Sequence, residues 1–199
     1  DISAMSANGT DWSAITLEGT GLLGEAGAPD LPAWTELYAI PDGASVDVRI
    51  LEKITDVISL DARVLPYQPV FENPEESQPA SPFVTKNALY ENSTAFFPRE
   101  EVTVSSPMVL RDLTVVGVNY YPARYRGSDN TLEITRSVTL EIQIDGGSRA
   151  ATSGPVSEAF IPIYQQFVRN WSDFLDEADV ARGTLSDLGG ASSADVYFE

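Results

Sequence analysis

Cysteine and histidine are both absent from the 199 residues of the chain. Without them the chain has no thiol nucleophile, no imidazole base, no disulfide and none of the usual zinc, copper or haem ligands. These absences exclude the enzyme classes that depend on either residue. We therefore expect no catalytic residues of the common kinds, no cofactor and no metal centre.

Positive charge and long apolar runs are scarce as well. Twelve basic residues face thirty acidic ones, which gives a net charge of −18. Such a surface repels phosphate backbones and anionic lipids, so we expect no nucleic-acid partner. No stretch approaches the roughly 18 apolar residues of a membrane helix, so we expect no membrane insertion either. The acidic start of the chain lacks the parts of a signal peptide, as a mature secreted protein or a cytosolic fragment would.

Short runs of alternating apolar and polar side chains make up most of the chain. Residues 12–18 form such a run, and so do residues 34–40, which end at a Pro-Asp-Gly turn. Because residues 46–50 alternate again after this turn, we expect a hairpin there. Residues 113–121 are β-branched and aromatic, which predicts a strand buried on both faces. About ten such strands predict an all-β fold, an antiparallel β-sandwich.

The pattern changes from a period of two to a helical period after residue 155. One amphipathic helix is therefore predicted near residues 157–177, at the C-terminal end of the sandwich. Its apolar positions are Phe160, Ile163, Tyr164, Phe167, Val168, Trp171, Phe174 and Leu175.

Four segments carry a resemblance to a known family. The first is GAPDLP at residues 27–32 with AIPDGA at residues 39–44, the second is AFFP at 95–98 with LRDL at 110–113, the third is YPARY at 121–125, and the fourth is the region 160–171, which ends in VRNW. Together and in this order they resemble the N-terminal propeptide of gingipain-like cysteine peptidases, peptidase family C25.

The resemblance implies a noncatalytic prodomain with a β-sandwich fold. Such a prodomain acts as intramolecular chaperone and inhibitor, and it occludes the active site of a caspase-like catalytic domain in cis until it is cleaved. It also implies a protein that is secreted, periplasmic or on the cell surface of a bacterium. Residues 194–198 look like the opening of that catalytic domain. We therefore divide the chain into a single prodomain, residues 1–181, and a flexible linker with a possible start of the catalytic domain, residues 182–199.

Arginines are the candidates for the inhibitory contact. Where the partner peptidase prefers basic residues, the side chain placed in its S1 pocket must be Arg or Lys. Arg124, Tyr125 and Arg126, just before a polar turn, are the first candidates for an inhibitory loop, with the two arginines as the basic side chains. Arg99 is weaker, because two glutamates follow it and could hold it in a surface pair. The alternative is that these arginines only solvate a strand end.

The stretch after the predicted helix holds a candidate for maturation. Arg182 and Gly183 lie among small and polar residues, a kind of segment that proteases cleave readily. The alternative is an ordinary helix C-terminus, with Gly183 as the left-handed cap.

Two other functions stay open on sequence alone. Exposed aromatic residues would suit a noncatalytic extracellular β-sandwich module for adhesion or carbohydrate binding. Thirty acidic residues would allow the carboxylate pair of an acid-based hydrolase, although none stands out. Acidic turns could bind calcium, but the ligand spacing of an EF-hand is absent and turn formation is the simpler interpretation.

Overall fold

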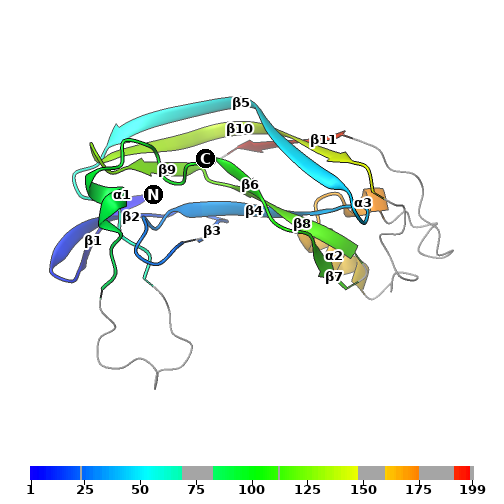
Figure 1. Ribbon diagram of the computed structural model, residues 1–199, viewed down its shortest axis with the longest axis horizontal. Coiled ribbons are helices and arrows are strands. Elements are labelled where there is room, and N and C mark those ends of the chain that lie inside the picture. The colour runs from blue at the N-terminus through cyan, green and yellow to red at the C-terminus, as the bar shows by residue number, and fades with distance from the viewer. Residues whose placement is uncertain (23, 69–82, 112, 148–159, 175–190, 198–199) are drawn as a thin grey trace, which may run out of the picture. The chain divides into compact units, whose positions relative to one another are not determined.

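The computed structural model describes residues 1–22, 24–68, 83–111, 113–147, 160–174 and 191–197 (Figure 1). Strands make up most of this part of the chain, which confirms the predicted all-β class. The chain divides into two compact units, each described by itself below. Unit 1 consists of Asp1–Trp34, Ile54–Glu101 and Tyr121–Arg136, and unit 2 of Thr35–Lys53, Val102–Tyr120 and Ser137–Glu199.

The strands of the described residues belong to three sheets. The bounds of the strands are β1 Ile2–Ala7, β2 Thr10–Ile15, β3 Gly21–Leu22, β4 Pro32–Ala39, β5 Ser45–Ser59, β6 Val102–Val104, β7 Met108–Leu110, β8 Leu113–Tyr120, β9 Ala123–Arg126, β10 Thr131–Asp145 and β11 Ala191–Tyr197. β1 and β2 form a hairpin, β11, β10 and β5 follow one another in a second sheet with β9 also on β10, and β3, β4, β8 and β6 form a third with β7 on β8. The packing of these sheets into a sandwich of about ten strands stays a prediction.

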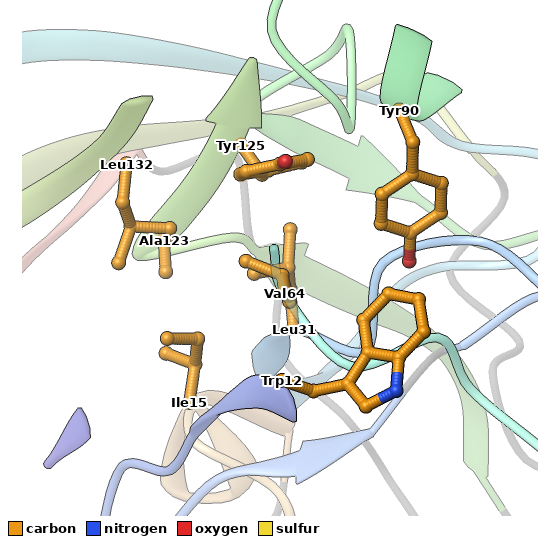
Figure 2. Packing of buried hydrophobic residues seen from close by; sticks show 8 residues of the cluster. All are labelled: Trp12, Ile15, Leu31, Val64, Tyr90, Ala123, Tyr125 and Leu132. Carbon is orange, nitrogen blue, oxygen red and sulfur yellow. The ribbon is translucent and has the colours of Figure 1, made fainter. Parts of the chain in front are cut away.

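Unit 1 is built around aromatic side chains (Figure 2). Tyr90, from the short helix α1 (Asn87–Glu91), is directed toward Trp12 of β2, with ring centroids 6.1 Å apart. On its other side the Tyr90 ring lies 5.8 Å from that of Tyr125. The buried residues of this cluster are Trp12, Ile15, Leu31, Val64, Tyr90, Ala123, Tyr125 and Leu132. These rings bury a large apolar area, which stabilises segments that are far apart in the sequence.

Unit 2 has apolar clusters on both faces of one strand. β8 is buried along almost its whole length, which confirms the predicted two-sided burial of this segment. Val115 packs with Ala39 and Tyr164, whereas its neighbour Val116 packs with Tyr38 and Ile142 in a second cluster. Successive side chains of a strand point to opposite faces, so β8 serves both clusters at once.

The prediction of a hairpin around residues 41–43 is wrong. β4 and β5 lie on either side of this turn but in different sheets. The turn itself forms as expected, with the Ala44 N–H donating to the Pro41 carbonyl at 3.0 Å and Gly43 at φ +76°. It is held to β8, because Thr114 donates to Asp42 at 2.5 Å. The same turn chemistry therefore joins two sheets here, and the long strand β10 takes the place of β4 beside β5.

The single helix predicted near residues 157–177 is also wrong within the described residues. Two short helices occur instead, α2 (Ile161–Phe167) and α3 (Trp171–Phe174). The helix ends because Val168 is extended and bridges Leu37 of β4, while the Arg169 N–H donates to the Leu37 carbonyl at 2.8 Å. Sheet bonding at this point replaces the helical hydrogen bonds that the apolar spacing had indicated.

Candidate functional site

The hairpin of β9 and β10 places the first candidate residues in unit 1. Arg126 is the register partner of Thr131, and Arg124 is the partner of Glu133. Because side chains alternate along a strand, the two arginines share one face of β9 and Tyr125 lies on the other. Tyr125 is fully buried in the aromatic core. The core residue thus fixes the strand, and both arginines point away from the core.

Arg124 is held by two carboxylates. Its Nη2 lies 2.6 Å from Oε1 of Glu133 and 2.8 Å from Oε1 of Glu101, and its Nε donates to the same Glu133 oxygen at 2.9 Å. The three side chains keep only 14–20% of their area exposed. A guanidinium this enclosed needs its partners, because an unpaired buried charge is costly. In this geometry Arg124 braces β9 against β10 and against the segment that precedes β6.

Arg126 is more open. It forms a two-point contact with Asp129 across the turn, with distances of 2.9 Å from Nε to Oδ1 and 2.7 Å from Nη2 to Oδ2. The Arg126 side chain is 31% exposed and that of Asp129 is 49% exposed. The hydrogen bonds from Arg126 are the main cause that lowers the pKa of Asp129 below its usual value. The guanidinium stays within reach of solvent.

Phe96 joins the two arginines. The guanidinium carbons of Arg124 and Arg126 lie 5.3 Å and 4.7 Å from the centre of its ring, within the range of a cation–π contact. The next residue, Phe97, exchanges both backbone hydrogen bonds with Tyr125 at 2.8 Å. We call Phe96, Glu101, Arg124, Arg126, Asp129 and Glu133 the arginine site.

Arg99 lies in the segment that carries Phe96 and Glu101. It is exposed, and among the described residues no ion pair holds it. The structure therefore brings all three candidate arginines onto two neighbouring segments, residues 96–101 and β9. Arg182 and Gly183, the candidates for maturation, lie outside the described residues.

Tyr125 fixes the turn next to the arginine site. Its hydroxyl donates to Oδ1 of Asn130 at 2.8 Å, and Nδ2 of Asn130 donates to the Leu60 carbonyl at 2.5 Å. Burial raises the pKa of Tyr125 to about 12, so the hydroxyl keeps its proton. At Gly127 a Cβ would lie 2.1 Å from the Leu89 carbonyl oxygen, so only glycine fits against α1.

The carboxylates and the ring of the arginine site were missed by the sequence analysis. Glu133 could have been found by counting residues outward from the polar turn, because that count places it opposite Arg124. Phe96 and Glu101 had no such local signal. Their contacts with β9 depend on pairing between segments about 25 residues apart in the chain.

Within the described ranges, no group of three or more acidic side chains is arranged to hold a metal ion. None of the described helices has the length and apolarity that a membrane span requires.

The segments that carried the resemblance have specific structural roles. Gly27 adopts φ +78°, and a Cβ there would lie 2.8 Å from a methyl carbon of Val84. Asp30, three residues later, has one buried carboxylate oxygen without a hydrogen bond, and burial raises its pKa. Asn170 clamps β4, because its amide accepts from the Ala39 N–H at 2.8 Å and donates to the Ala39 carbonyl at 3.0 Å.

A family model decides the assignment. The model Propeptide_C25 matches residues 5–173, which is most of the chain. The chain belongs to the propeptide family of C25 cysteine peptidases. As a propeptide without cysteine or histidine, this C25 propeptide is noncatalytic.

Curated relatives of this C25 propeptide are gingipains from Porphyromonas gingivalis. Lys-gingipain is 24% identical over 169 residues, which cover 83% of this chain and 10% of the relative. Gingipain R2 is 27% identical over 123 residues, or 60% of this chain and 16% of the relative. The chain thus spans about a tenth of the length of the first relatives it matches.

Solved structures with a similar fold also come from P. gingivalis. A structure described as giving insight into the zymogenic latency of gingipain K matches with a TM-score of 0.62 and 25% identity, covering 72% of this chain and 80% of that one. A complex of the pro- and mature domains of RgpB matches with a TM-score of 0.65 and 23% identity, covering 86% and 87%. The second likeness shows the fold alone.

Proposed function

We propose that this C25 propeptide is the intramolecular chaperone and inhibitor of a gingipain-like cysteine peptidase catalytic domain encoded with it in cis. The family match over residues 5–173 carries this proposal. The likeness to a structure concerned with zymogenic latency supports it. In this role the domain occludes the active site until the precursor is cleaved. The protein would act outside the cytoplasm, as a secreted, periplasmic or cell-surface protein of a bacterium.

The arginine site is the proposed inhibitory surface. Arg126 keeps its guanidinium near solvent, and Arg99 is exposed, so either side chain can reach a partner without unfolding the strand. Arg124 would have to leave two carboxylates to do the same. We therefore rank Arg126 and Arg99 before Arg124 as the basic side chain offered to an S1 pocket, and we keep Arg182–Gly183 as the proposed maturation cleavage.

Inhibition in trans tests the proposal. The chain is titrated against the separately produced mature catalytic domain of the same precursor, and initial rates with a peptide substrate give an inhibition constant. We expect inhibition by the wild-type chain, and we expect Arg126→Ala or Arg99→Ala to weaken it on the order of 100-fold, the effect of losing a central hot-spot side chain. Refolding of the catalytic domain with and without the chain tests the chaperone role.

Arg136→Ala is the matched control. Arg136 lies on β10 in the same unit, is exposed and pairs with Asp56, so it is a similar arginine outside the arginine site. This control should inhibit like the wild-type chain. Undiminished inhibition by both test variants would remove Arg99 and Arg126 from the mechanism, and a wild-type chain that does not inhibit would overturn the function itself.

A further inference from the structure

β11 belongs to the same sheet as β10, although the two strands lie far apart in the sequence. It pairs antiparallel with β10 over seven residues, from Ser137 opposite Tyr197 to Gln143 opposite Ala191. In the order β11, β10, β5 it is the end strand. Without β11, the backbone N–H and C=O groups on that edge of residues 137–143 would lose their partners, and an open strand edge readily pairs with any extended segment.

The connection to β11 holds the proposed cleavage site. α3 ends at Phe174 and β11 begins at Ala191, so Arg182 and Gly183 lie on the segment between them. A cut there breaks the covalent chain, but it removes none of the backbone pairing between β10 and β11. Cleavage and release are therefore separate events in this topology.

We propose that β11 is a noncovalent tether: after cleavage between α3 and β11, the segment that begins at Ala191 stays docked on β10 by strand pairing. The biological role of this tether rests on the proposed function. Since the relatives are about ten times longer, the chain that continues from β11 in a precursor would be the inhibited peptidase. The occupant of the β10 edge is thus a segment of this chain, and what it retains is the downstream domain.

The strength of such a tether follows from strand addition. Main-chain hydrogen bonds supply the affinity when an extended segment joins a sheet edge. The hydrogen bonds contribute about 0.5–1.5 kcal/mol each, and ordering the backbone costs about 1–2 kcal/mol per residue, so a seven-residue pair is weak alone. When a second contact between the same partners exists, the weak pair multiplies the overall affinity through its effective concentration. The tether then delays release without preventing it.

Anisotropy after a controlled nick tests the tether. Residues 183–188 are replaced by the recognition sequence of a site-specific protease, and a fluorophore is attached after Glu199. Because the seven-residue pair is weak alone, we expect the anisotropy of the nicked chain to lie above the free-peptide value at the highest concentration and to fall toward it on dilution. Free-peptide anisotropy at every concentration would overturn the proposal.

Proline substitutions at two neighbouring positions of β11 give a matched pair of variants. Successive residues of an antiparallel strand direct their N–H groups alternately toward the partner strand and away from it. Of Ser193→Pro and Ala194→Pro, one therefore removes a hydrogen bond to β10 and the other sits at an outward N–H, where an end strand tolerates proline. We expect a difference of at least about 10-fold in the dilution half-point between the two variants.

Equal half-points for the two proline variants would show that strand pairing does not hold the segment. Because the assay contains no peptidase, its failure leaves the proposed inhibition standing. Conversely, a nicked chain that keeps β11 bound, together with a chain that does not inhibit the peptidase in trans, would contradict the proposed function and leave the tether standing.

Discussion

The two parts of β10 are paired in different ways. Residues 131–134 pair with β9 across a turn of four residues, whereas residues 137–143 pair with β11, which begins almost fifty residues later in the chain. The first pairing is reinforced by side chains, since Arg124 bonds Glu133 and Tyr125 bonds Asn130. The second is described here by its backbone register alone.

The two pairings differ in the length of chain that each must close, a four-residue turn for β9 and a connection of almost fifty residues for β11. A short turn costs little closure entropy, and buried side-chain contacts add stability that backbone pairing lacks. The β9 part is therefore held in one shape, as the proposed inhibitory surface requires. The β11 part is the segment that would leave after the proposed cleavage.

Tyr125→Ala should give the largest loss of stability. It removes a fully buried ring from the aromatic core under the arginine site, and such truncations cost about 3–5 kcal/mol. Tyr125→Phe keeps the ring and loses only the bond to Asn130, so it should cost about 1 kcal/mol. Urea unfolding measures both values. Near-equal losses in the two variants would show that the hydroxyl, and not the packed ring, fixes this part of β10.

Glu133→Gln tests the ion pairs of the fixed part. The Arg124 guanidinium would keep Glu101 but lose a charged acceptor in a largely enclosed position, which should cost about 1–3 kcal/mol. Glu141→Gln is the matched control on the β11 part of the same strand, because Glu141 has no ion pair among the described residues. Its free energy of unfolding should change by less than about 0.5 kcal/mol. A cost at residue 141 as large as at residue 133 would break the contrast between the two parts.

Local patterns predicted the strands but not their neighbours. The alternation at residues 34–40 and the apolar run at residues 113–121 became β4 and β8, because burial on one or two faces leaves a direct trace in the residue order. The turn after β4 was also recognised. Which strand lies beside β5 is decided by β10, about ninety residues away, and no local pattern records that choice.

The arginine site was predicted in part for a similar reason. Arg124, Arg126 and Arg99 stood out because a basic side chain would fill the S1 pocket of a peptidase that prefers basic residues, and because Arg124 and Arg126 lie just before a turn. Their partners Phe96 and Glu101 come from another segment, joined to β9 by backbone pairing at Phe97. The break of the predicted helix at Val168 has the same cause, since a bridge to Leu37 overrides the helical period. Long-range pairing is the part of this fold that a single sequence does not display.

Asp129→Asn should have the smallest effect and a defined pH dependence. The pKa of Asp129 is lowered mainly by the hydrogen bonds from Arg126, so the pair stabilises the folded state above the unfolded pKa of about 3.9. That contribution is lost as pH falls through the lower, folded-state pKa. The melting temperature of the wild-type chain should therefore exceed that of the variant slightly at pH 7, and the difference should vanish at the lowest pH at which both still fold.

Salt sharpens the same measurement. Arg126 and Asp129 keep 31% and 49% of their side-chain area exposed, so about 1 M salt should screen the pair and shrink the difference at pH 7 as well. Arg124 and its carboxylates are enclosed and should respond much less to salt. A difference between wild type and Asp129→Asn that persists unchanged at low pH and high salt would mean that Asp129 acts through turn geometry. Arg126 would then be freer to leave its partner for a peptidase than the ion pair suggests.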